Sequence, residues 1–185
     1  MFSVVREPDF KYTFAKLCDM TTVKEESNID NGVKLGIDID IFPLDSCSSH
    51  ILNQFVQKRI QFYQVGCVLS KFNTSEGKPF VKRCVINYCR TRGYSYFHNK
   101  LVKLICKEIE RGSTYKGCLM WPVYGAREVL PAEVFANSVK VEFEGEFFDA
   151  PTGYDEYLRS LYGDYEKDPP LEKQKTHHNF KAYRL

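Results

Sequence analysis

The segment that most constrains the fold is Gly36-Ile-Asp-Ile-Asp-Ile-Phe-Pro43, in which apolar and acidic residues alternate strictly. A period of two residues is that of a β-strand, whose successive side chains point to opposite faces of a sheet. Pro43 ends the pattern because proline has no N–H to donate to a neighbouring strand. The segment therefore predicts a strand with two different faces, one formed by Ile37, Ile39 and Ile41 and the other by Asp38 and Asp40.

The two aspartates allow two interpretations. Alternate residues of a strand lie about 6 to 7 Å apart, so both carboxylates can belong to the solvated face of an edge strand. Alternatively, the three β-branched residues on the opposite face, followed by Phe-Pro-Leu-Asp, favour a buried strand. Buried carboxylates need a cation or hydrogen-bond donors. Mg²⁺ or Mn²⁺, held on oxygen ligands for phosphoryl transfer, would meet that need.

Helical periodicity is present in two later segments. Apolar residues recur at helical spacing over roughly 50 to 65, directly after serines that can cap a helix. A second helix is expected near 95 to 110, where Gly112 ends the run. Its apolar face consists of Phe97, Leu101, Leu104, Ile105 and Ile109.

The period changes to two again in the last third of the chain. Apolar and charged residues alternate over 139–144, and Gly145 lies where a hairpin should turn toward Pro151. Thr152 is expected to cap one more helix, with Asp155 in place of the usual glutamate of a capping box. Strands interleaved with helices indicate the α+β class.

Length and composition indicate one domain. With 185 residues, 43% of them apolar, the chain can bury its own core, which we assign to residues 1–166, followed by a polar tail at 167–185. The net charge of +2 is too small to imply a nucleic-acid partner. Seven cysteines, an odd number without a CxxC pair, indicate reduced thiols. No segment resembles a signal peptide or a transmembrane helix, so we expect a soluble cytoplasmic protein.

Five segments, in order along the chain, resemble the carboxyl-terminal two-thirds of LicD proteins. LicD is a family of bacterial phosphotransferases related to fukutin and fukutin-related protein. The match extends over nearly the whole chain, and five ordered segments are far more specific than any one of them. The segments are Tyr12-Thr-Phe-Ala-Lys-Leu-Cys-Asp-Met-Thr-Thr22, Gly36-Ile-Asp-Ile-Asp-Ile-Phe-Pro-Leu-Asp45, Val141-Glu-Phe-Glu-Gly145, Pro151 with Tyr157-Leu158, and Leu161-Tyr-Gly-Asp-Tyr-Glu-Lys-Asp-Pro-Pro170.

The resemblance implies a metal-dependent phosphotransferase with a nucleotidyltransferase-like fold, present here in part as a mixed sheet flanked by helices. Such an enzyme transfers phosphorylcholine or a similar phospho-alcohol from a CDP-activated donor to a cell-surface glycan, in lipopolysaccharide or teichoic acid. Asp40 matches the third metal-binding carboxylate of the family. This match makes Asp40 the catalytic candidate and, together with Asp38, the candidate ligand of Mg²⁺ or Mn²⁺. Asp38 departs from the family pattern, which usually has an aromatic or aliphatic residue at that position.

Three further residues are candidates for substrate binding. The family commonly has an arginine where this chain has Cys18, so Lys16 is the remaining cation that can contact a phosphate; a solvated surface lysine is the alternative. Aromatic faces attract cations, and Trp121 and Tyr124 can form a box for the quaternary ammonium of choline. Packing in the core is the alternative for these rings and for the tyrosines that could join them, Tyr154, Tyr157, Tyr162 and Tyr165. We do not expect the adjacent His177 and His178 to be ligands.

The resemblance also indicates what the chain lacks. Family members carry their first two metal-binding carboxylates in a Gly-Thr…Trp-Asp-Asp-Asp-Ile-Asp region, and nothing in residues 1–35 resembles it. One hypothesis is a transferase that is complete only in a chain extended upstream, and another is a truncated, non-catalytic remnant. The third is a split enzyme in which a second chain supplies the missing Asp-x-Asp strands. An exposed edge strand would be its physical sign.

Overall fold

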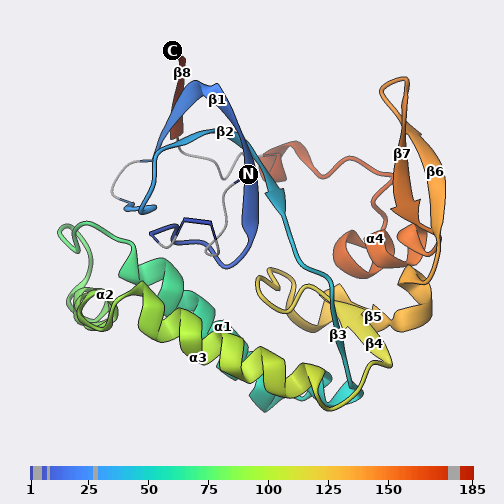
Figure 1. Cartoon of the computed structure of the whole chain (residues 1–185), viewed down its shortest axis with the longest axis horizontal. Helices are drawn as coiled ribbons and strands as arrows, with labels where there is room; N and C mark the ends of the chain where they lie inside the picture. The colour runs from blue at the N-terminus through green and yellow to red at the C-terminus, as the bar shows by residue number, and fades with distance from the viewer. Residues whose placement is uncertain (2–5, 8, 27–28, 175–179) are drawn as a thin grey trace.

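The computed structural model describes residues 1, 6–7, 9–26, 29–174 and 180–185. Within them, four α-helices and eight strands confirm the α+β class (Figure 1). The strands form three small sheets, and every pair of neighbouring strands in them is antiparallel. The expected mixed sheet is therefore wrong for the described part of the chain.

A layer of three helices forms one side of the molecule (Figure 1). It consists of α1 (Gln54–Ser70), α2 (Phe80–Arg92) and α3 (Tyr94–Ile109), and α1 packs along α3. Gly66 allows this close approach, because a Cβ atom built there would lie 2.1 Å from Cδ1 of Phe97. At this point the close approach of the two helices therefore requires a residue without a side chain.

The helix expected over 50 to 65 begins later and ends later than predicted. Its first residues form a separate 3₁₀ turn, η1 (Ser49–Leu52), after which Asn53 caps α1 by accepting a 2.9 Å hydrogen bond from the N–H of Phe55. The second expected helix is confirmed as α3. Helix α2 was not predicted, although most of its apolar residues lie on one side of the helix. Only Ile86 and Cys89 of α2 are buried, whereas Phe80 is exposed.

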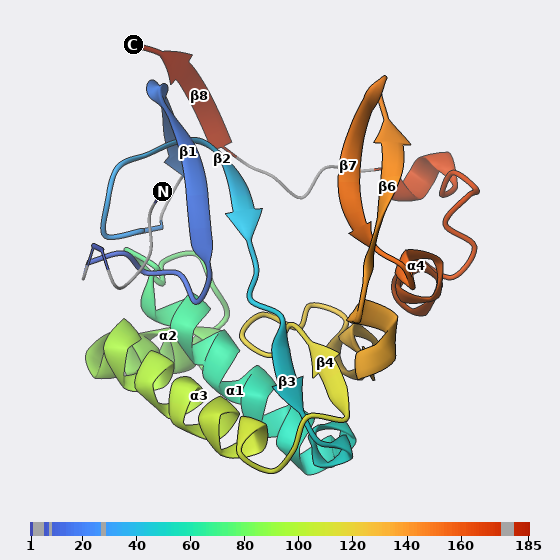
Figure 2. The ribbon, with the colours of Figure 1, turned by 45° about the vertical axis from the view of Figure 1, so that its right-hand side comes forward.

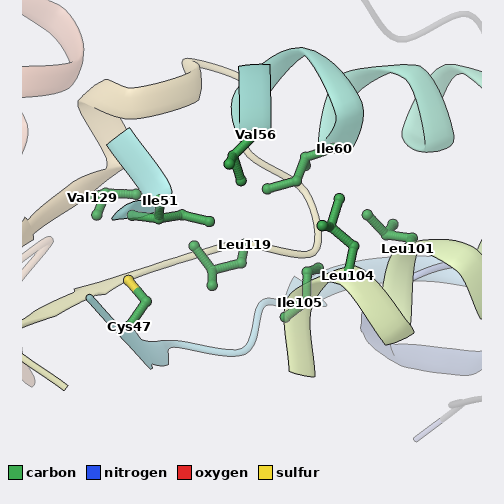
Figure 3. Close-up of a cluster of buried hydrophobic side chains, with 9 residues drawn as sticks. All are labelled: Cys47, Ile51, Val56, Ile60, Leu101, Leu104, Ile105, Leu119 and Val129. Carbon is green, nitrogen blue, oxygen red and sulfur yellow. The ribbon is translucent and has the colours of Figure 1, made fainter. Parts of the chain in front are cut away.

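The main core lies between the helical layer and the connections above it. Figure 3 shows side chains of α1 and α3 pointing toward Leu119, with Cys47 at one end of the cluster. Leu101 and Ile51 are fully buried. The nine members of this cluster are Cys47, Ile51, Val56, Ile60, Leu101, Leu104, Ile105, Leu119 and Val129.

A small three-stranded sheet packs over this core. Its strands are β3 (Asp45–Cys47), β4 (Tyr115–Gly117) and β5 (Val129–Pro131), in the order β3-β4-β5. Two 3₁₀ turns, η2 (Gly125–Glu128) and η3 (Ala132–Phe135), flank β5. Through β3, the core is linked directly to the alternating segment that precedes it.

The alternating segment forms β2 (Leu35–Ile41), in a second sheet with β1 (Ala15–Glu26) and β8 (Phe180–Arg184). The strand order is β2-β1-β8, so β2 is an edge strand (Figure 2). Strand β8 lies in the segment expected to be a polar tail, yet Phe180 pairs with Glu26 of β1. His177 and His178 lie outside the described residues.

The alternation of β2 is confirmed, but the face expected to be buried is the exposed one. Ile37, Ile39 and Ile41 are 50%, 68% and 43% exposed. The side chain of Asp38, by contrast, is only 4% exposed. The buried-strand interpretation of the isoleucines is therefore wrong within the described chain, because no element of it covers their side of the sheet.

A third sheet is the predicted hairpin, formed by β6 (Ser138–Phe143) and β7 (Glu146–Pro151). Its turn has positive φ angles at Glu144 (51°) and Gly145 (82°), as expected for a two-residue type I′ turn. Helix α4 (Tyr154–Tyr162) follows, but the expected capping box is wrong. The N-cap residue is Gly153, and Asp155 instead pairs with Arg159 one turn later. A short 3₁₀ turn, η4 (Leu171–Lys173), lies beyond α4.

None of the helices in the described residues is both long enough and apolar enough to cross a membrane.

Candidate functional site

The register of β1 and β2 brings three of the predicted site residues together. Lys16 lies directly opposite Asp40, and Cys18 lies opposite Asp38. The ammonium group of Lys16 donates to both carboxylates, to Oδ2 of Asp38 and to Oδ1 of Asp40. Lys24 adds a second ammonium, which donates to Oδ1 of Asp38 at 2.6 Å. We call Lys16, Lys24, Asp38 and Asp40 the ionic cluster.

Burial and pairing act in opposite directions on these groups. Burial by itself would raise the pKa of Asp38, but hydrogen bonds from Lys16 and Lys24 outweigh it and hold that pKa below the ordinary value. Burial would lower the pKa of Lys16, but its hydrogen bonds to Asp38 and Asp40 raise it above the ordinary value. Both partners are therefore charged at neutral pH.

The ionic cluster opens into a cavity of about 530 Å³, which we call the charged cavity. The Lys16 ammonium lies 4.6 Å from the ring centroid of Tyr12 and 5.3 Å from that of Phe14, within cation–π range. Asp40 is more accessible than the two residues it is grouped with: 38% of its side chain is exposed, against 4% for Lys16 and 4% for Asp38. The cavity is lined by Tyr12, Phe14, Lys16, Lys24, Glu26, Ile37, Asp38, Asp40, Trp121 and Phe180.

The ionic cluster alone does not make a divalent-metal site. Both oxygens of Asp38 accept hydrogen bonds from lysines, and Lys16 lies between Asp38 and Asp40, where a bridging ion would have to bind. Among the described residues, no group of three or more His, Cys, Asp or Glu side chains is arranged to hold a metal. The residues present therefore do not fit a complete Mg²⁺ or Mn²⁺ site. The ligand roles of Asp38 and Asp40 stay predictions.

The two predicted aromatic residues, Trp121 and Tyr124, share one cavity. Trp121 lines the charged cavity and also a second one, of about 420 Å³, which we call the aromatic cavity. Tyr124 lines the aromatic cavity but not the charged one. Of the four tyrosines predicted to join them, Tyr157 and Tyr162 line the aromatic cavity. The full lining is Phe42, Cys118, Trp121, Val123, Tyr124, Glu128, Tyr157, Leu158, Leu161 and Tyr162.

Several residues of the charged cavity were missed. Tyr12, Phe14 and Lys16 are spaced two residues apart, so the period of two that identified β2 was a usable signal for this segment as well. Phe180 gave no such signal, because only the pairing of β8 with β1 brings it next to Lys24, with its ring centroid 5.0 Å from the ammonium.

The structure is thus that of an α+β protein in which strands β1 and β2 carry the ionic cluster, and the charged cavity beside this cluster adjoins the aromatic cavity. Comparison with known proteins shows which family this protein is related to. The chain is 35% identical over 107 residues to the lipopolysaccharide cholinephosphotransferase LicD of Haemophilus influenzae. The match covers 57% of this chain and 40% of that relative. This chain is thus a distant homologue of LicD, which confirms the resemblance seen in the motifs.

Two further comparisons gave nothing. No protein-family model matches the sequence, and no solved structure matches it.

Proposed function

We propose that this chain forms part of a LicD-type phosphotransferase, which transfers phosphorylcholine or a similar phospho-alcohol from a CDP-activated donor to a cell-surface glycan. The observation that carries the proposal is the homology to a lipopolysaccharide cholinephosphotransferase. The predicted residues Lys16, Asp38 and Asp40 gather at one cavity, which supports it. The proposal includes a partial nucleotidyltransferase-like fold. It also places the protein in the cytoplasm, which the odd number of cysteines favours.

The geometry of the ionic cluster suggests different roles for Asp40 and Lys16 in binding the substrate. Asp40 is accessible from solvent and is the carboxylate that a substrate can reach. Lys16 can turn its ammonium toward a phosphate, because Lys24 remains to pair with Asp38. Mg²⁺ or Mn²⁺ belongs to the proposal for the complete site, where further oxygen ligands from outside the described residues must join Asp40.

The test measures CMP release from CDP-choline by the purified protein, with lipopolysaccharide as acceptor and Mg²⁺ or Mn²⁺ present. Asp40→Asn should abolish release while the circular dichroism spectrum remains that of the folded chain. Asp149→Asn is the matched control, because Asp149 is an exposed aspartate on β7. Unchanged turnover in Asp40→Asn would sink the assignment of the active site.

A second candidate function is one half of a split enzyme, and the exposed edge strand favours it. Strand β2 has a free edge in the described sheet, and next to it lies the exposed surface of Ile37, Ile39 and Ile41. The chain spans 40% of the length of its LicD relative, so a second chain could supply the rest. We propose that such a chain would add strands to the edge of β2.

This candidate predicts a chain that releases no CMP by itself and gains activity when the unmatched part of the LicD relative is added as a separate polypeptide. Ile39→Lys should prevent this gain by placing a charge on the contact surface. A chain inactive both alone and after addition would instead favour the truncated, non-catalytic remnant.

A further inference from the structure

The aromatic cavity contains a buried carboxylate that the proposed function does not use. Glu128, in η2, is 6% exposed, and its Oε1 accepts a 2.6 Å hydrogen bond from the N–H of Tyr124. The N–H of Val123 also donates to this carboxylate, but burial outweighs both hydrogen bonds and raises the pKa of Glu128 above its ordinary value. No ion pair in the described part of the chain includes Glu128. An ionised carboxylate out of contact with water is costly unless a cation or several donors accompany it.

Five aromatic rings surround the cavity that Glu128 lines, and they come from four separate parts of the chain. Phe42 follows β2, Trp121 follows β4, Tyr124 precedes η2, and Tyr157 and Tyr162 belong to α4. Aromatic faces carry partial negative charge, so rings around a carboxylate form a site for a cation that is too large and too weakly hydrated to need water.

Contacts between α4 and η2 hold this wall in place. The ring of Tyr162 packs edge-on against Tyr124, with centroids 5.3 Å apart. The hydroxyl of Ser160 donates a 2.7 Å hydrogen bond to the carbonyl of Arg127. The guanidinium of Arg127 lies 5.3 Å from the ring centroid of Tyr124, so this ring already accepts one cation.

The aromatic cavity adjoins the charged cavity. Trp121 lines both, and Phe14 of the charged cavity contacts Phe42 and Trp121 at ring-centroid distances of 4.6 and 5.6 Å. A molecule with a phosphate at one end and a cation at the other can therefore use two neighbouring cavities of opposite character.

We propose that the aromatic cavity binds a quaternary ammonium group, with Glu128 as its counter-charge and Trp121, Tyr124, Tyr157 and Tyr162 as its aromatic wall. The inference rests on the proposed function in that it assigns the cationic end of the phospho-alcohol donor to this cavity. Glu128 is then a specificity-determining residue, because it separates cationic from neutral ligands of the same shape.

The test is calorimetric titration of the purified chain with choline and with 3,3-dimethylbutan-1-ol, which has the shape of choline but no charge. Choline should bind about tenfold more tightly than the neutral alcohol, as expected for a desolvated cation–π site with a carboxylate. Equal affinity would overturn the proposal, because the cavity would then recognise only an apolar shape.

Two variants locate the site, and a third is the control. Glu128→Gln keeps the volume and the acceptor for the Tyr124 N–H, and it should weaken choline about tenfold without changing the affinity for the alcohol. Tyr162→Leu, at a half-exposed ring, should weaken choline as well and does not depend on how Glu128→Gln folds. Glu133→Gln, at an exposed glutamate in η3, should change nothing. Tyr12→Leu changes the charged cavity instead. If choline binding is lost in Tyr12→Leu but kept in Glu128→Gln and in Tyr162→Leu, the cation binds in the charged cavity and the inference is refuted.

These outcomes are separable from the transferase reaction. Charge-selective choline binding, with no CMP release from CDP-choline either by the chain alone or after addition of the unmatched part of the LicD relative, would leave the inference standing and the proposed function refuted. If the protein releases CMP and Glu128→Gln has the same KM for CDP-choline as the wild type, the proposed function stands and the inference is refuted.

Discussion

The most demanding prediction concerns Lys16→Met, which removes the ammonium at the centre of the ionic cluster but keeps an aliphatic side chain. Removing one partner of a buried ion pair costs about 3 to 5 kcal/mol, because the other charge stays buried. Lys16 and Asp38 are each 4% exposed, so this range applies. Asp38 keeps Lys24 at 2.6 Å and Asp40 is partly solvated, so we expect the low end, about 3 kcal/mol.

The measurement is urea unfolding at pH 7, followed by circular dichroism, with the thermal midpoint as a second readout. For a chain of this length about 3 kcal/mol lowers the midpoint by roughly 6 to 12 °C. Lys103→Met, at an exposed lysine of α3, is the control and should change the free energy of unfolding by less than about 0.5 kcal/mol. A loss below about 1 kcal/mol in Lys16→Met would refute the view that the cluster is a buried ionic network.

The same cluster predicts a dependence on pH. The pKa of Asp38 is lower in the folded chain than its ordinary value of 3.8, so its pairing stabilises the fold above that value. This contribution is lost as the pH falls through the lower, folded-state pKa. The difference in stability between the wild type and Lys16→Met should therefore shrink below about pH 3.8. A constant difference down to pH 2 would contradict the ionic explanation.

Three further predictions concern packing, the exposed sheet and the thiols. Gly66→Ala should cost about 1 to 3 kcal/mol in urea unfolding, because its Cβ would meet Phe97, and a neutral result would show that the helices can separate freely. Ile39→Thr should change the stability by less than about 0.5 kcal/mol, and a large loss would mean that this face of the sheet is covered. Under limited alkylation read by mass spectrometry, the exposed Cys84 and Cys106 should react first. Cys47, Cys67 and Cys118 should react slowly, because burial raises the pKa of their thiols to about 11, 12 and 11 respectively. Early labelling of these three cysteines would contradict their burial.

Sequence periodicity was a good guide wherever an element buries one face against a neighbour that is close in the chain. Helix α3 and the hairpin β6–β7 were predicted because their side-chain spacing and turn residues are local properties. Helix α2 was missed although Phe80, Val81 and Val85 lie on one side of it, and these residues are exposed rather than buried against a neighbour. Its boundary with α3 depends on Gly93, which has a φ of 78°.

The candidate site was predictable in part. The motif around Asp40 identified one strand of it, and Lys16 was a candidate through the family-like segment that contains it, but neither the strand of Lys16 nor its pairing with β2 was predicted. The pairing of these two strands decides that Lys16 binds Asp38 and Asp40, and so turns a hypothetical metal pair into an ion-paired cluster. Glu128 carried no sequence signal, because its role depends on the tertiary structure bringing Phe42 and the α4 rings of Tyr157 and Tyr162 next to Trp121 and Tyr124.

The sequence by itself determined the alternation of β2, the helix α3, the hairpin turn at Gly145 and the relationship to LicD. Each of these features depends on residues that are adjacent or regularly spaced along the chain. Only the tertiary structure decided which face of β2 is buried. Alternation fixes that the isoleucines and aspartates point in opposite directions, but the direction that leads inward depends on which elements pack against the sheet. Here the ammonium groups of Lys16 and Lys24 lie against the aspartates, and the isoleucines face outward.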